Sequence, residues 1–256
     1  MKKILLGAIG YFAATMTAFA ADLAAQIPPP APLPVPVIYS WTGCYFGAEG
    51  GGNWGRSQQI ARSGPNAALA ITGKFNLSGS IAGGTVGCNV QFSNFVVSIE
   101  NDYSWTDKKG SANDMLPFNP AAISSTREKW IDTLRPRFGY AIDRFLVYGT
   151  VGIAWAGTSV NVVNPAIGAF VTDSKTRTGW TAGVGAEWAA WVGPWGAVTF
   201  KLEYLHVGFT DKQYIIPPVV FAGGTVATRD ASLSDDMVRV GMNVKFNWGG
   251  PLVARY

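Results

Sequence analysis

The chain has 256 residues, of which only 14% are charged while 13% are aromatic, and it contains 31 glycines. A soluble secreted domain usually carries about 25% charged residues, so the composition disfavours that class. A membrane β-barrel can be apolar on average without any continuous apolar segment. No stretch after Ala20 resembles an apolar helix of membrane length, which favours strands over helices as the spanning elements.

The amino terminus has the pattern of a signal peptide at residues 1–20. Lysines precede an apolar run that ends in Ala18-Phe19-Ala20, a small-x-small motif of the kind that signal peptidase accepts. A retained helical anchor is the alternative, but the run is shorter than the ~20 apolar residues that a spanning helix needs. Because Lys2 and Lys3 would leave with the peptide, the formal net charge would fall from +4 to +2. We therefore expect no nucleic-acid partner.

Residues 21–40 are rich in proline, which cannot donate to a β-ladder and favours extended polyproline geometry. We interpret this segment as a periplasmic spacer that precedes a barrel domain at residues 41–256. Such a composition has two interpretations: a disordered tail that contacts no partner, which is the simpler one, or a segment that lies close to peptidoglycan.

The segment Val238–Phe246 alternates strictly between apolar residues and polar, charged or glycine residues. Alternate side chains of a strand point to opposite faces, so one face requires an apolar environment and the other a polar one. Eight segments of roughly ten residues show this period, as membrane strands do. They lie near residues 43–54, 79–92, 95–105, 129–140, 145–156, 179–189, 197–207 and 237–247.

The connections between these segments alternate in length. Short turns fall at Phe92–Asn94, Ala141–Arg144 and Ala190–Gly196, while long polar or glycine-rich loops are expected near 55–78, 106–128, 157–178 and 208–236. Short turns at one end and long loops at the other are typical of outer-membrane barrels. The predicted fold is therefore all-β, an eight-stranded antiparallel up-and-down transmembrane β-barrel in the cell outer membrane. A soluble lipocalin-like barrel would not place so many aromatic residues near the strand ends.

Those aromatic residues are expected to form girdles at the two membrane interfaces. They are Trp41, Trp54, Trp105, Trp130, Tyr140, Trp155, Trp180, Trp188 and Trp248.

In the last strand, the alternation shows which positions face inward. Extending this alternation to the earlier strands through their hairpin connections predicts which charged side chains face the lumen. The acidic members are Glu49, Glu100, Asp102, Glu187 and Glu203, and the basic members are Arg135, Arg137, Lys201, Arg239 and Lys245. Buried charges must pair, so we expect Glu100 and Asp102 to meet Arg135 and Arg137, and Lys201 and Glu203 to lie near Glu187. The outward set is expected to be free of charge. An ion-pair network that fills the lumen is favoured over a narrow solute path, because an eight-stranded barrel has room only for its own side chains.

Few residues suggest chemistry. Cys44 and Cys88 are predicted to point outward on adjacent strands of an exported chain, so a disulfide and two free thiols are both open. The single histidine, His206, does not support a metal cluster or a catalytic triad, and an interfacial position is expected for it. We therefore predict no enzymatic activity and no cofactor.

Five stretches together resemble the small outer-membrane β-barrel proteins of alphaproteobacteria, the family of the 25- and 31-kDa surface antigens and their rhizobial relatives. They are Trp41–Ala48, Thr133–Tyr140, Gly179–Glu187, Lys201–Leu205 and Val238–Phe246. The resemblance implies an abundant barrel that supports envelope integrity and exposes its loops. It also extends to haemin-binding members, so a surface receptor is an alternative, as is a narrow diffusion porin.

The partners expected on this basis are outer-membrane lipid, lipopolysaccharide and the assembly machinery. Outer-membrane barrels commonly present a terminal strand that ends in an aromatic residue, and Phe246 and Tyr256 compete for that role.

Overall fold

The computed structural model describes residues 39–210, 212–216 and 227–246, so the predicted signal peptide, nearly all of the spacer, Trp248 and Tyr256 lie outside the described residues. Ten strands follow one another along this part of the chain. They are β1 (Gly43–Ala61), β2 (Phe75–Phe92), β3 (Phe95–Thr106), β4 (Lys109–Asn113), β5 (Ile123–Ile142), β6 (Phe145–Asn164), β7 (Ala169–Gly193), β8 (Gly196–Phe209), β9 (Lys212–Ile216) and β10 (Ala227–Phe246). No helix among these residues is long and apolar enough to cross a membrane.

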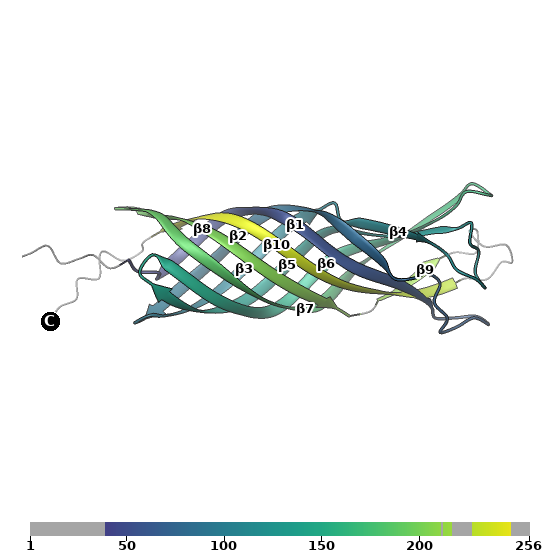
Figure 1. Cartoon of the computed structure of the whole chain (residues 1–256), viewed down its shortest axis with the longest axis horizontal. Coiled ribbons are helices and arrows are strands. Elements are labelled where there is room, and N and C mark those ends of the chain that lie inside the picture. The colour runs from purple at the N-terminus through teal and green to yellow at the C-terminus, as the bar shows by residue number, and fades with distance from the viewer. Residues whose placement is uncertain (1–38, 211, 217–226, 247–256) are drawn as a thin grey trace, which may run out of the picture. The chain divides into compact units, whose positions relative to one another are not determined.

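Eight of the strands form a closed antiparallel ring. The order β1-β10-β8-β7-β6-β5-β3-β2 closes because β2 pairs again with β1. The short strands β4 and β9 continue the wall above β3 and β8, and both lie at the end away from the short turns (Figure 1). Closure leaves no unpaired strand edge facing lipid, the condition for a sheet to span a membrane. The predicted eight-stranded up-and-down barrel is confirmed.

The short turns lie where the sequence predicts them. Two-residue turns join β2 to β3 and β5 to β6, and their first residues, Ser93 and Asp143, have left-handed φ values of 54° and 49°. Such φ values match the twist of tight hairpins. In outer-membrane barrels the end with short turns faces the periplasm, which orients the molecule.

The opposite end differs from the prediction, because most of the expected loop residues extend the strands. The loop expected at 157–178 is a hairpin in which β6 runs to Asn164 and β7 starts at Ala169. The outward face of these extensions is largely polar, with exceptions such as Phe170, because beyond the membrane the wall meets water. The apolar alternation used to find strands therefore stops before the strands do.

Among the described residues, the aromatic side chains predicted for the girdles lie in two bands on the outer wall, with one exception. Trp130 and Tyr140 on β5 lie in the outer and periplasmic bands, ten residues apart. At ~3.4 Å per residue and a tilt of ~40° this spacing corresponds to a height of roughly 26 Å, close to the apolar band of such barrels. Trp41 is the exception, because it is fully buried inside the periplasmic mouth.

Candidate functional site

The middle of the lumen holds a network of nine buried charged side chains from six strands. Each is at most 7% exposed, and all face inward because they occupy the alternate positions opposite the apolar outer wall. The members are Glu49 on β1, Glu100 and Asp102 on β3, Arg135 and Arg137 on β5, Glu187 on β7, Lys201 and Glu203 on β8, and Arg239 on β10.

Arg135 joins three carboxylates. Its guanidinium lies 2.8 Å from Glu100, 2.6 Å from Asp102 and 3.0 Å from Glu203. Arg239 binds Asp102 at 2.8 Å and Glu203 at 2.6 Å, and it also pairs with Glu49. Two arginines from opposite sides of the ring thus share Asp102 and Glu203. Such bidentate, charge-assisted contacts suit the planar guanidinium.

Arg137 connects this cluster to the periplasmic side. It pairs with Glu100 and, at 2.8 Å, with Glu187, while its guanidinium carbon lies 3.8 Å from the ring centre of Tyr148. Thr199 donates a hydrogen bond of 2.5 Å to Glu187. Both terminal nitrogens of this guanidinium therefore contact carboxylates, and its flat face lies on the Tyr148 ring.

The sequence predicts the pairing of Glu100 and Asp102 with the arginines of β5, and the structure brings these residues together. It differs for Lys201, which faces Glu187 in the β7–β8 register but pairs with Glu49 at 3.0 Å and Glu100 at 3.3 Å. A lysine side chain is long enough to extend across the lumen. Which residues form ion pairs therefore depends on which side chains can reach one another across the barrel, and not on which strands are neighbours in the sheet.

Lys245 is the predicted member that lies outside the network. Among the described residues it pairs with no carboxylate; its ammonium donates to the Ser40 carbonyl and lies 4.6 Å from the ring centre of Tyr39. The reason is its position near the periplasmic end of β10, where residues 39–41 enter the lumen.

Residues 39–41 fill the periplasmic mouth. The Trp41 indole donates to the Asp143 carbonyl at 3.1 Å, and its backbone amide donates to the Gln91 side chain at 2.7 Å. Tyr39 packs edge-on against Trp41 with ring centres 5.0 Å apart. Trp41 therefore seals the mouth from within, and its prediction as a girdle residue is wrong because it precedes β1 and folds inward.

A second group of buried charges lies above the first and was not predicted. Lys108 pairs with Glu128 at 3.0 Å and with Asp235, and all three side chains are fully buried. Burial alone would lower the pKa of Lys108, but the two carboxylates raise it above its ordinary value. These residues fall in the segments expected to be loops, so the alternation that identified the other inward charges did not include them.

The two cysteines are joined. Cys44 and Cys88 occupy directly opposite positions in the β1–β2 register and form a disulfide with a Cα–Cα distance of 3.9 Å. Cys88 is exposed on the outer wall near the periplasmic end. The disulfide covalently links β1 to β2, the two strands whose pairing closes the ring.

Of the two candidate terminal aromatics, the structure describes Phe246. It ends β10, pairs with Cys44 and Gly196, and stacks on Phe46 with ring centres 5.5 Å apart. Phe246 is the last residue of β10 that the structure describes, and the choice between Phe246 and Tyr256 as the assembly signal stays a prediction.

The outer wall is not free of charge, contrary to the prediction. Asp132 faces outward and accepts a 2.8 Å hydrogen bond from Asn101. Asp236 accepts hydrogen bonds from Tyr204 at 2.6 Å and contacts His206 Nδ1 at 2.8 Å. Both acids lie near the outer aromatic band, where a charged group costs less than at mid-membrane.

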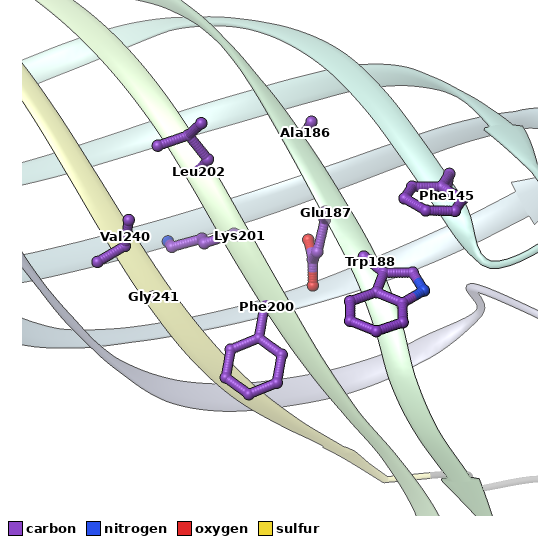
Figure 2. A pocket seen from close by; sticks show the side chains of 9 residues that line it. All are labelled: Phe145, Ala186, Glu187, Trp188, Phe200, Lys201, Leu202, Val240 and Gly241. Carbon is purple, nitrogen blue, oxygen red and sulfur yellow. The ribbon is translucent and has the colours of Figure 1, made fainter.

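The outer wall also carries a shallow apolar groove of about 390 Å³ between β7, β8 and β10. The small Ala186 lies among the larger Phe145, Trp188 and Phe200, while Gly241, Glu187 and Lys201 occupy lumenal positions behind them (Figure 2). The lining is that of a lipid-facing surface and offers no catalytic group.

A closed ring of eight tilted strands, an apolar wall between two aromatic bands and a polar core define a transmembrane β-barrel of the outer membrane. The family model for the outer membrane protein beta-barrel domain matches residues 12–246. The chain belongs to this family.

Known relatives agree. The 31 kDa outer-membrane immunogenic protein of Brucella melitensis is 32% identical over 96% of this chain and 100% of its own length. The 25 kDa outer-membrane immunogenic protein of Brucella canis is 30% identical over 96% and 99%. The 22 kDa outer membrane protein of Rhizobium leguminosarum is 26% identical over 83% and 82%. The protein is thus located in the outer membrane.

Among solved structures, the outer membrane protein OprG of Pseudomonas aeruginosa superposes with a TM-score of 0.51 at 14% identity, covering 80% of this chain and 97% of that one. At this identity the likeness shows the fold alone. It agrees with the eight-stranded ring.

Proposed function

We propose that this protein is a structural component of the outer membrane, whose wall supports envelope integrity and whose lumen is closed to solutes. The observation that carries the proposal is the nine-residue ion-pair network. Its members come from six of the eight ring strands and are bonded across the lumen, as in the contacts of Arg135 with both β3 and β8. An eight-stranded barrel is only wide enough for side chains, so a solute could pass only if these pairs separated.

The closed periplasmic mouth supports the same proposal. Trp41 is held there by two hydrogen bonds, and Lys245 binds the segment that carries it. A solute path would therefore have to displace both this segment and the central network. Breaking one buried ion pair costs about 3–5 kcal/mol, which makes spontaneous opening rare.

Conductance in planar bilayers tests the closed lumen. Purified, refolded protein should give no stable single-channel steps, whereas a 16-stranded porin in the same bilayer should give them. Heat-modifiable gel mobility confirms that the inserted protein is folded. Reproducible steps above background from the folded protein would replace the proposal with a diffusion pore.

The envelope role requires a cellular test. A strain lacking the protein should release periplasmic enzymes and become sensitive to detergents, and the intact chain should restore resistance. A chain in which the outer parts of the β6–β7 hairpin are replaced by a short turn should also restore it, since the wall is retained. Normal detergent resistance in the deletion strain would contradict the proposal.

A receptor for haemin receives less support from the geometry. His206 is the single histidine of the chain, and its ring contacts Asp236 on the outer wall beside Trp180, 5.4 Å between ring centres. When the protein is titrated with haemin, we expect the Soret band to keep the position that it has in free haemin. A shifted band that is lost in His206→Ala would favour the receptor.

A further inference from the structure

Three basic side chains form a cluster on the outer wall above the outer aromatic band. Lys109 on β4 and Arg127 on β5 are direct cross-strand partners, both exposed and both outward. Lys129 follows on the outward face of β5, also exposed, next to the bulge between Glu128 and Trp130. We call Lys109, Arg127 and Lys129 the cationic cluster.

Like charges directly opposite each other in a sheet are destabilising unless something compensates them. In the part of the chain that the structure describes, no ion pair joins any member of the cluster to a carboxylate. Asp107 lies two residues from Lys109, but its carboxylate accepts the backbone NH of Ser80 at 2.7 Å. The cluster therefore presents three positive charges that form no ion pair within the described part of the wall.

The depth of the cluster in the membrane identifies what can neutralise it. Tyr103 lies between Trp105 and Trp130, with ring centres 5.2 Å and 6.0 Å away, and this aromatic trio marks the outer edge of the hydrocarbon layer. Arg127 is three residues above Trp130 along β5, roughly 8 Å in height at a strand tilt of ~40°. The headgroup layer on each side of a bilayer is about 5–8 Å thick, so the cluster lies at the level of headgroup phosphates.

Two other basic residues at this end have carboxylate partners. Arg62 pairs with Asp230 at 2.8 Å, and Lys175, on the same face of β7 as the buried Arg177, lies 3.8 Å from Asp173. The cationic cluster differs from these two residues because it places adjacent positive charges directly above the aromatic trio.

We propose that the cationic cluster binds the phosphate groups of a phosphorylated glycolipid of the outer leaflet, with its acyl chains against the aromatic trio below. Arg127 supplies a planar fork for a phosphate, and the two lysines add point charges on either side of it. This contact would anchor the barrel to its surrounding lipid on the β3–β4–β5 side.

The test compares binding of purified lipopolysaccharide to detergent-folded protein and to two triple variants. The first, Lys109→Gln/Arg127→Gln/Lys129→Gln, removes the cluster. The second, Arg62→Gln/Lys74→Gln/Lys175→Gln, removes the same charge from exposed positions elsewhere. Heat-modifiable mobility checks that all three proteins are folded.

We expect the first variant to bind about 100-fold more weakly, which corresponds to about 1 kcal/mol for each removed cation. The second should stay within a few-fold of the unmodified protein, and enzymatically dephosphorylated lipopolysaccharide should bind the unmodified protein as weakly as lipopolysaccharide binds the first variant. Equal weakening of both variants would show that net charge alone acts, and unchanged binding of the dephosphorylated lipid would exclude phosphate as the ligand. Either result overturns the proposal, as does full competition by millimolar inorganic phosphate, which would indicate a site for the free anion.

Discussion

Replacing Arg135 by alanine tests the account of the lumen. The guanidinium is fully buried and contacts Glu100, Asp102 and Glu203 at 2.6–3.0 Å. The variant leaves three basic residues in the network against five acidic ones. Removing one partner of a buried pair costs about 3–5 kcal/mol.

The structure places the expected loss toward the lower part of that range. Each carboxylate that loses Arg135 keeps another cation, since Arg137 and Lys201 remain at Glu100, and Arg239 remains at Asp102 and Glu203. We therefore expect Arg135→Ala to lower the free energy of unfolding by about 3–4 kcal/mol. Adding Glu203→Gln should restore about 1–2 kcal/mol, because the excess negative charge is reduced.

Urea unfolding of the refolded protein in detergent micelles, followed by tryptophan fluorescence and heat-modifiable mobility, measures these values. The control is Arg62→Ala, because that side chain is 65% exposed in its ion pair and should contribute only about 0–1 kcal/mol. A loss for Arg135→Ala no larger than for this control would refute the reasoning that the lumenal pairs are buried and interdependent.

Three further predictions concern other parts of the barrel. Reduction of the Cys44–Cys88 bridge, which closes a sequence separation of 44, should lower stability by up to about 4 kcal/mol and add the mass of two hydrogen atoms; two freely alkylated thiols without reductant would show that no bridge forms. Trp41→Ala should cost about 3–5 kcal/mol by emptying the periplasmic mouth, whereas Trp188→Ala on the outer wall should cost clearly less, and equal losses would argue against a buried Trp41. Gly185→Ala should cost about 1–3 kcal/mol because its new methyl group overlaps the Tyr148 ring, while Gly149→Ala, with no other atom closer than 4.0 Å, should be near neutral in the same urea assay.

The barrel itself could be read from the sequence because its signal is local. The alternation along Val238–Phe246 and along the other seven segments predicts which side chains face lipid. The lipid face of β10 indeed contains the exposed Val238, Val240 and Met242. The inward phase follows from the same rule, and it placed Arg239 and Glu203 in the lumen. Each step depends only on the two-residue period of a strand.

The extent of the strands could not be read in this way. Beyond the outer aromatic band the wall no longer faces lipid, so a residue such as Thr176 on β7 can be polar without leaving the sheet. Lys108, Glu128 and Asp235 were missed for this reason, although they are as deeply buried as the central network.

The sequence alone determined the class of protein, the number of ring strands, the periplasmic turns and the inward charges of the membrane-spanning part, because all of these follow from residue period and composition. Only the tertiary structure decided which charges pair, that Lys245 binds the segment carrying Trp41, that Cys44 meets Cys88, and that Lys109 stands beside Arg127. These contacts depend on how eight tilted strands are staggered around the ring and on how far each side chain reaches across it. No local pattern in the chain encodes that stagger.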